Sequence, residues 1–131
     1  MIVLDTHAWI WWVSNPENLS DVATDAINKA IPEMKIHVSS ISVWEVALLV
    51  ARGRLKLTLD VSDWVAKSES LPFLTFIPVN NNIVMKSVQL PGPFHKDPAD
   101  RIIIATALSI GGILISKDDK MKNYPHVNTL W

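Results

Sequence analysis

Residues 1–12 read MIVLDTHAWIWW, and this opening stretch decides the fold. Residues 1–5 form a short apolar run that ends on Asp5, which predicts a buried strand, and a helix is expected to follow at once over residues 6–13. The run is continuous rather than alternating, so helices are expected to cover both faces of the strand. This arrangement is typical of a parallel sheet inside an α/β protein.

The rest of the chain repeats this alternation of short strands and helices. Further helices are expected over residues 21–31, 41–52, 61–71, 80–89 and 97–111, and further strands over residues 35–39, 74–79, 113–116 and 126–130. No repeat or linker divides the 131 residues, so we expect a single domain, an α/β sandwich around a parallel sheet. Ligands of such folds bind at the carboxyl ends of the strands, where Asp5 and Asp118 are expected.

The composition excludes several classes of protein. The chain has no cysteine, which rules out disulfides, zinc fingers and thiol chemistry. It opens without a basic leader, and its longest uncharged apolar stretch, residues 102–116, is shorter than the roughly 18 residues of a membrane helix. We therefore expect a soluble cytoplasmic protein with no membrane partner. The net charge of −1 gives no general support to nucleic-acid binding, which would have to depend on local basic groups.

Glu45 is the most informative acidic residue, because the expected helix around it is almost wholly apolar. Its neighbours three and four positions away are Ile41, Ser42, Leu48 and Leu49. A buried carboxylate is costly unless it is neutralised, paired or bound to a metal ion. Glu45 is therefore expected either to pair with a distant cation, such as Arg101, or to belong to a functional site.

Four other acids each have a purely structural explanation. Asp5 and Asp97 stand where they would cap a following helix, and Pro98 strengthens this interpretation for Asp97. Asp100 falls in the first turn of the same helix, and Asp118 suits a polar turn. An α/β fold would nevertheless bring Asp5, Asp100 and Asp118 to one edge of the sheet.

Such a gathering of carboxylates has chemical consequences. Carboxylates repel one another strongly at short range, so their assembly needs a cation. Oxygen ligands without cysteine or a paired histidine motif select hard ions such as Mg²⁺ or Mn²⁺. Clusters of this kind typically serve phosphoryl chemistry, in which the metal ion activates water and neutralises developing charge.

Four segments of the chain together resemble the PIN-domain ribonucleases, and most closely the VapC-type toxins of bacterial toxin–antitoxin systems. The segments are MIVLDTHAWIWW (1–12), SSISVWEVALLVARGRL (39–55), HKDPADRIIIATAL (95–108) and ILISKDDKM (113–121). Each motif is weak alone, but the four occur in the order and spacing of the family, and they span essentially the whole chain.

The resemblance implies a PIN-like three-layer sandwich with a parallel five-stranded sheet, and an endoribonuclease that hydrolyses RNA phosphodiester bonds with bound Mg²⁺ or Mn²⁺. The residues that match the family's acids are Asp5, Glu45, Asp100 and Asp118, with Asp97 as the extra acid of one subgroup. In this interpretation Asp5, Asp100 and Asp118 hold the metal ion, and Glu45 binds it or positions the attacking water. Thr6 and Ser116 match small hydroxyl positions that orient the acids.

Substrate and partner surfaces are expected around these acids. The basic residues expected to hold an RNA backbone are Arg52, Arg54, Lys96 and Lys117, although Arg52 also suits a helix C-terminus and Arg101 suits an ion pair with a buried acid. His95 lies beside the acids, where a surface loop histidine is the simpler interpretation. Trp9, Trp11 and Trp12 share one short helix, so at least one is expected in the core. By family resemblance the exposed remainder would serve a homodimer and a cognate antitoxin, and tRNA is one candidate substrate.

Two alternatives remain open at this stage. A phosphatase of the haloacid-dehalogenase type needs a second aspartate two residues after the first, where this chain has His7. A non-catalytic α/β protein-binding module with a structural metal would not explain Glu45 within an apolar helix. Cleavage that depends on Mg²⁺ or Mn²⁺ separates the nuclease from such a module.

Overall fold

The computed structural model describes residues 1–94 and 96–131. Its strands are β1 (Ile2–Leu4), β2 (Ile36–Ser39), β3 (Leu74–Ile77), β4 (Ile113–Ile115) and β5 (Thr129–Leu130). Its helices are α1 (Thr6–Ser14), the 3₁₀ helix η1 (Pro16–Asn18), α2 (Asp21–Ala30), α3 (Ser40–Ala51), α4 (Val61–Glu69), α5 (Asn81–Val88), α6 (Pro98–Ile110) and α7 (Asp119–Lys122). Apart from η1 and α7, each element lies where the sequence predicts it.

The five strands form one sheet in the order β3-β2-β1-β4-β5, and every neighbouring pair is parallel. The chain moves outward from β1 through β2 to β3, and then crosses back to place β4 on the other side of β1. The strand order therefore reverses between β1 and β4. In open α/β sheets the crevice at such a reversal is where ligands bind, and Asp5 directly follows β1 at this point.

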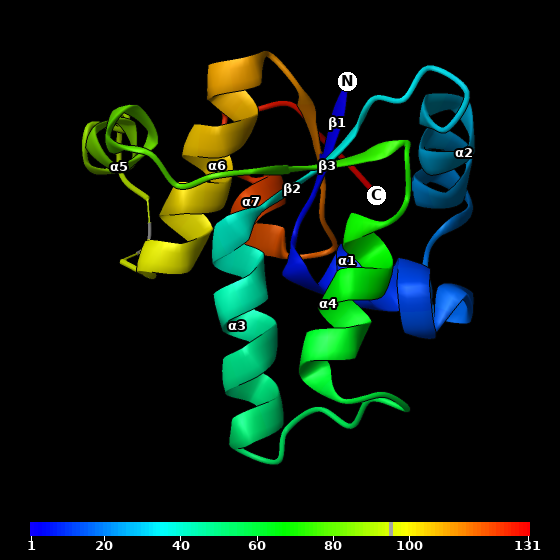
Figure 1. Cartoon of the computed structure of the whole chain (residues 1–131). Helices are drawn as coiled ribbons and strands as arrows, with labels where there is room; N and C mark the ends of the chain where they lie inside the picture. The colour runs from blue at the N-terminus through cyan, green and yellow to red at the C-terminus, as the bar shows by residue number, and fades with distance from the viewer. Residues whose placement is uncertain (95) are drawn as a thin grey trace.

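Helices cover both faces of the sheet, as the continuous apolar strands predict. Ile2 and Leu4 of β1 point into a core shared with α1, α2, α3 and α4, whereas Val3 points into a second core shared with α6 and α7. Figure 1 shows α5 and α6 on one side of the strands and α2 on the other. The predicted α/β three-layer sandwich with a parallel five-stranded sheet is confirmed.

The three tryptophans of α1 have different surroundings. Trp9 is completely buried, its indole N–H donates to the Ser68 hydroxyl at 3.1 Å, and its ring packs against Trp64 with centroids 4.6 Å apart. Trp11 and Trp12 are half-buried against other aromatic side chains of the same chain. One tryptophan therefore lies in the core, as expected, and the other two are less exposed than the sequence suggested.

Two details near the end of the chain differ from expectation. Asp118 and Asp119 do not form a simple turn, because Asp118 accepts a hydrogen bond from the Lys120 amide at 2.9 Å and caps the short helix α7. The strand expected over residues 126–130 is only Thr129–Leu130. Its partner β4 is itself only three residues long, which limits the ladder that β5 can form. Within the described residues, no helix is long and apolar enough to cross a membrane.

Removing the Trp9 ring should test the importance of this core. Because a fully buried tryptophan is lost, Trp9→Ala is expected to lower the free energy of unfolding by about 3–5 kcal/mol. The matched control is Trp44→Ala, in which an exposed tryptophan is truncated with an expected cost of about 0.5 kcal/mol or less. Urea unfolding followed by circular dichroism measures both, and equal losses would contradict the assignment of Trp9 as a core residue.

Candidate active site

Asp5 stands at the carboxyl end of β1 and caps α1. Its Oδ1 accepts a hydrogen bond from the Ala8 amide at 2.8 Å, so the capping interpretation is correct as geometry. The side chain is also buried, with 7% of its surface exposed, and burial is the main reason that the pKa of Asp5 is raised. The capping residue is therefore also a carboxylate whose charge is disfavoured by its burial in the crevice.

Ser116 links Asp5 to Asp118. Its fully buried hydroxyl accepts a hydrogen bond from the Asp118 amide at 3.1 Å and is hydrogen-bonded to the Asp5 carboxylate, which lowers the pKa of Asp5 against the effect of burial. Asp118 itself is exposed. A single hydroxyl at the end of β4 thus connects the carboxyl ends of two neighbouring strands.

Glu45 points from α3 toward the same crevice. Its Oε1 accepts a hydrogen bond from the Thr6 hydroxyl, which is itself 2.9 Å from the buried Ser42 hydroxyl. Burial is the main cause of its raised pKa, and the Asp97 and Asp5 carboxylates raise it further. Among the described residues, the ion pair between Glu45 and Arg101, which the sequence allowed, does not form. The Arg101 Nε instead donates to the Ser87 carbonyl at 2.9 Å.

Asp97 and Asp100 come from the start of α6. Asp97 caps the helix, with Oδ1 accepting from the Ala99 amide at 2.9 Å and from the Asp100 amide at 3.2 Å. The Asp100 side chain lies partly buried among the other acids, and its pKa is raised to about 7. Burial is the largest cause, followed by the Asp97, Glu45, Asp118 and Asp5 carboxylates.

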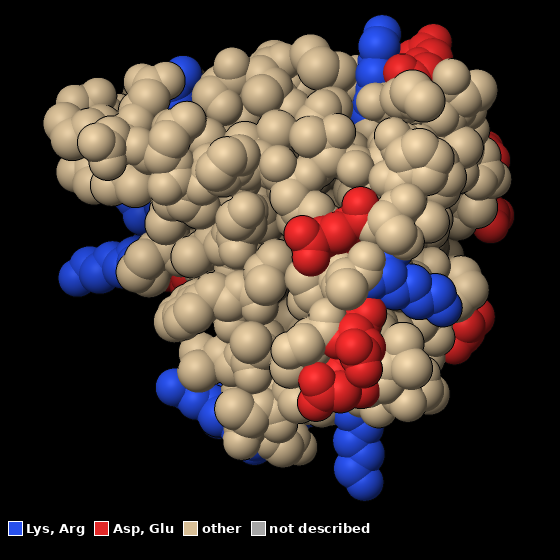
Figure 2. Space-filling model, viewed as in Figure 1, with Lys and Arg blue, Asp and Glu red and all other residues tan. Residues whose placement is uncertain are grey.

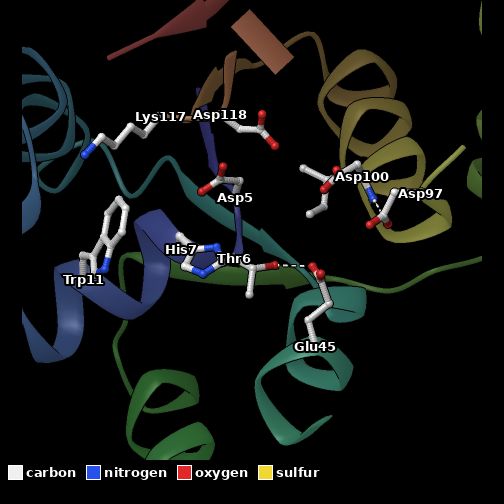
Figure 3. Close-up of a pocket in the computed structure, with 10 residues that line it drawn as sticks. Asp5, Thr6, His7, Trp11, Glu45, Asp97, Asp100, Lys117 and Asp118 are labelled. Atoms are coloured by element: carbon white, nitrogen blue, oxygen red, sulfur yellow. Dashed lines mark hydrogen bonds between the residues drawn. The ribbon is translucent and has the colours of Figure 1, made fainter. Parts of the chain in front are cut away.

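These side chains line one pocket of about 550 Å³. Figure 3 shows Asp5 at its centre, Asp118, Asp100 and Glu45 around it, and Lys117 with Trp11 on the side opposite Asp97. The lining residues are Asp5, Thr6, His7, Trp11, Glu45, Asp97, Asp100, Ile103, Lys117 and Asp118. All five acids selected from the sequence therefore meet in one place, although they come from four separate segments of the chain.

The acids suit a hard divalent cation. Their donor atoms are all carboxylate oxygens, and their mutual repulsion, seen in the raised pKa of Asp100, is relieved when a cation lies among them. In the described part of the chain, no three acidic or histidine side chains converge closely enough to form a finished metal site. The pocket thus supplies suitable ligands that a bound ion would draw together.

The predicted basic residues are distributed around this pocket. The Lys117 Nζ lies 5.8 Å from the centre of the Trp11 ring, and Arg52 and Arg54 line an adjoining pocket together with Glu45. Lys96 is exposed and does not line either pocket, and His95 lies outside the described residues. The face seen in Figure 2 carries acidic side chains over the region of α4, with a basic side chain between them and others near the margins of the face.

His7 is a pocket residue that the sequence interpretation did not assign. It lies in the first turn of α1, exposed between the two pockets, and its charge lowers the pKa of Asp5 and of Glu45. The signal available in the sequence was its position two residues after the strand-ending Asp5. Because the histidines show no metal-ligand spacing in the sequence, no role was assigned to His7.

Comparison with known proteins agrees with the motifs. The sequence profile of the PIN domain matches residues 2–127. The chain is 32% identical to Ribonuclease VapC22 of Mycobacterium tuberculosis, over 99% of this chain and 98% of that protein. The fold is similar to a toxin–antitoxin complex from Klebsiella pneumoniae, with a TM-score of 0.68 and 18% identity over 100% of this chain and 97% of that chain.

The fold is similar to a second solved structure about as closely as to the Klebsiella pneumoniae complex. This second structure is VapBC2 from Rickettsia felis bound to a DNA fragment from its promoter, with a TM-score of 0.70 and 17% identity over 99% of this chain and 98% of that chain. The acid-lined crevice at the strand reversal of the parallel sheet is where α/β proteins of this class bind ligands. The chain belongs to the PIN-domain family, whose ribonucleases generally depend on divalent metal ions.

The pKa of Asp100 predicts how the stability of the metal-free protein changes with pH. Because the folded protein binds this proton more tightly than the unfolded chain does, the free energy of unfolding should fall as pH rises from about 4 to about 7. The raised pKa values of Asp5 and Glu45 act in the same direction. Thermal melts in EDTA should therefore show a lower Tm at about pH 8 than at about pH 5.5.

Substitution of Asp100 isolates its share of this effect. Asp100→Asn should raise the Tm of the metal-free protein at pH above about 7 and flatten its dependence on pH, since it removes a charge that burial and the neighbouring carboxylates disfavour. Asp25→Asn, on the exposed side of α2, is the matched control and should change neither quantity. A Tm of Asp100→Asn equal to that of the wild type across this range would show that burial and the neighbouring carboxylates do not disfavour the charge of Asp100 as the structure indicates.

Proposed function

We propose that this protein is a metal-dependent endoribonuclease and the toxin of a type II toxin–antitoxin pair. One observation carries the proposal: carboxylates from four separate segments gather in one pocket where the strand order reverses. Assembling them without a cation is costly, which favours a functional use over a structural one. The relative named as a ribonuclease shares 32% of its residues over nearly the whole chain and supports RNA as the substrate.

In this proposal Asp5, Asp100 and Asp118 hold Mg²⁺ or Mn²⁺, and Asp97 contributes at the edge of the site. A bound ion of this kind lowers the pKa of water and neutralises the charge that develops on a phosphodiester. Ser116 connects the Asp5 carboxylate to the backbone of Asp118 through its two hydrogen bonds. The Asp5 carboxylate is therefore oriented before substrate arrives, and a bound ion would draw the other ligands toward it.

Glu45 is the proposed general base. The Thr6 hydroxyl occupies its Oε1, which leaves Oε2 to accept a proton from the attacking water. Its raised pKa brings a carboxylate closer to the range in which a general base is effective near neutral pH. Thr6, held by the Ser42 hydroxyl, is a positioning residue, since it acts on the reaction only through Glu45.

The proposed partners are a cognate antitoxin and a second copy of the chain. Trp12, Val13 and Leu71 line a shallow pocket between α1 and α4 that suits an apolar antitoxin segment. Val84, Met85 and Val88 are exposed on α5, where they suit a homodimer interface. The toxin–antitoxin complex from Klebsiella pneumoniae, similar in fold, supports the antitoxin partner.

The direct test is cleavage of a mixed pool of tRNA and structured RNA in the presence of Mg²⁺ or Mn²⁺. The wild type is expected to cut, EDTA should stop it, and Asp5→Asn and Glu45→Gln should each lose at least about 100-fold in rate. Asp25→Asn is the matched control, because it removes an exposed acid that does not line the pocket. Folding of every variant is checked by its thermal melt.

Two outcomes would contradict the proposal. Equal cleavage by the wild type and both site variants would assign the activity to a contaminant and the acids to a structural role. No cleavage of any RNA with either ion would favour the non-catalytic binding module.

A further inference from the structure

Trp44 is the only aromatic residue among the large exposed hydrophobic side chains of residues 1–94 and 96–131. It lies on α3, directly before Glu45, and 55% of its surface is exposed. Large aromatic side chains lower the free energy most when their surface is buried. An exposed tryptophan beside a candidate catalytic residue therefore suggests that a ligand covers it. The ring of Trp11 is less available to a ligand than that of Trp44, because His7, Lys117 and Trp131 already contact it.

Trp44 lines a second pocket of about 380 Å³, called here the Trp44 groove. Trp44, Leu48 and Arg52 follow one another at intervals of four residues, so α3 presents them as one stripe along the groove. Pro98 and Ala99 of α6 also line it. The Trp44 groove shares His7, Glu45 and Asp97 with the carboxylate pocket, so the two pockets form one continuous depression.

Charge is separated along this depression. The carboxylates lie at the end that contains Glu45, and Arg52 and Arg54 lie at the other end. Arg52 is seven residues after Glu45, which is about 10 Å along the axis of α3. Within the described chain, neither guanidinium forms an ion pair or a side-chain hydrogen bond, so both are free to bind an anion.

We propose that the Trp44 groove binds unpaired nucleotides of RNA next to the bond that is cut, and this proposal rests on the proposed ribonuclease function. One base stacks on the Trp44 ring, and the adjoining phosphates bind Arg52 and Arg54. Aromatic side chains stack on a base of any sequence, provided that its face is free, so the subsite selects single-stranded RNA. RNA fits better than a second copy of this chain, because the groove combines free guanidinium groups with direct access to the carboxylates.

The test measures binding separately from cleavage. The Asp5→Asn protein, as a full chain with Mg²⁺ present, is titrated into a fluorescently labelled single-stranded oligoribonucleotide of mixed sequence, and anisotropy gives Kd. Adding Trp44→Ala should weaken binding about 5- to 150-fold, while Trp44→Phe should keep most of the affinity because a ring remains. The fully paired form of the same oligonucleotide should lose little affinity with Trp44→Ala.

The arginines are tested in the same assay. Arg52→Ala and Arg54→Ala should each weaken binding and reduce the slope of log Kd against log salt concentration by about 0.7. Lys29→Ala, an exposed cation on α2 outside both pockets, is the matched control and should change neither quantity. Unchanged slopes in both arginine variants would remove the phosphate contacts from the proposal.

The remaining outcomes distinguish this proposal from the one on which it rests. If wild-type protein cleaves RNA but Trp44→Ala binds single strands as tightly as its parent, the Trp44 groove proposal is overturned and the ribonuclease assignment stands. If Trp44→Ala instead converts a dimer into a monomer by light scattering, with affinity per chain unchanged, the groove is an interface between copies. If the wild type neither binds nor cleaves RNA, both proposals fail.

Discussion

The cost of burying and crowding carboxylates in one pocket, lined by Asp5, Glu45, Asp97, Asp100 and Asp118, is the constraint on which the rest of the structure depends. Each of these acids loses hydration or gains a like-charged neighbour when the chain folds, and the raised pKa values of Asp5, Glu45 and Asp100 record that cost. The sandwich must therefore supply enough packing energy elsewhere to hold them together. Two apolar cores, one on each face of a sheet with very short strands, provide it.

Hydrogen bonding and helix capping make this crowding tolerable. Asp5, Asp97 and Asp118 each accept a hydrogen bond from a backbone amide at the start of a helix. Three of the five acids therefore lie at the positive end of a helix dipole. Hydroxyl groups assist two acids: Thr6 donates to Glu45, and Ser116 is hydrogen-bonded to Asp5. The same contacts that stabilise negative charge also fix where each carboxylate points, so stability and orientation arise together.

The sequence was sufficient for most of the fold and for the set of acids, for identifiable physical reasons. Continuous apolar runs marked the strands, and Pro98 with Asp97 marked the start of α6. The choice between cap and functional site could not be made for Asp5, because the two interpretations are compatible in the folded chain. Capping is a local property that sequence reveals, whereas the gathering of the caps at one edge depends on strand order.

The positions of two pocket residues could not be predicted from the sequence, because segments far away in the chain determine their surroundings. No role was assigned to Trp44 from the sequence, because the helix around it is almost wholly apolar, yet the packing of α3 leaves more than half of its surface exposed. His7 had no motif of its own, and only the position of α1 beside α3 gives it a place between the two pockets. Whether a residue is exposed on a mostly buried helix depends on tertiary packing, which periodicity in one helix does not reveal.

The strand order also affects when activity can arise during synthesis. β1 is made first, but β4, its neighbour on one side, and the attached Asp118 follow only after more than a hundred residues. A nascent chain that ends before β4 leaves one edge of β1 unpaired and lacks Ser116 and Asp118 altogether. The acid-lined pocket therefore cannot be completed during synthesis until the segment that carries Asp118 has emerged from the ribosome.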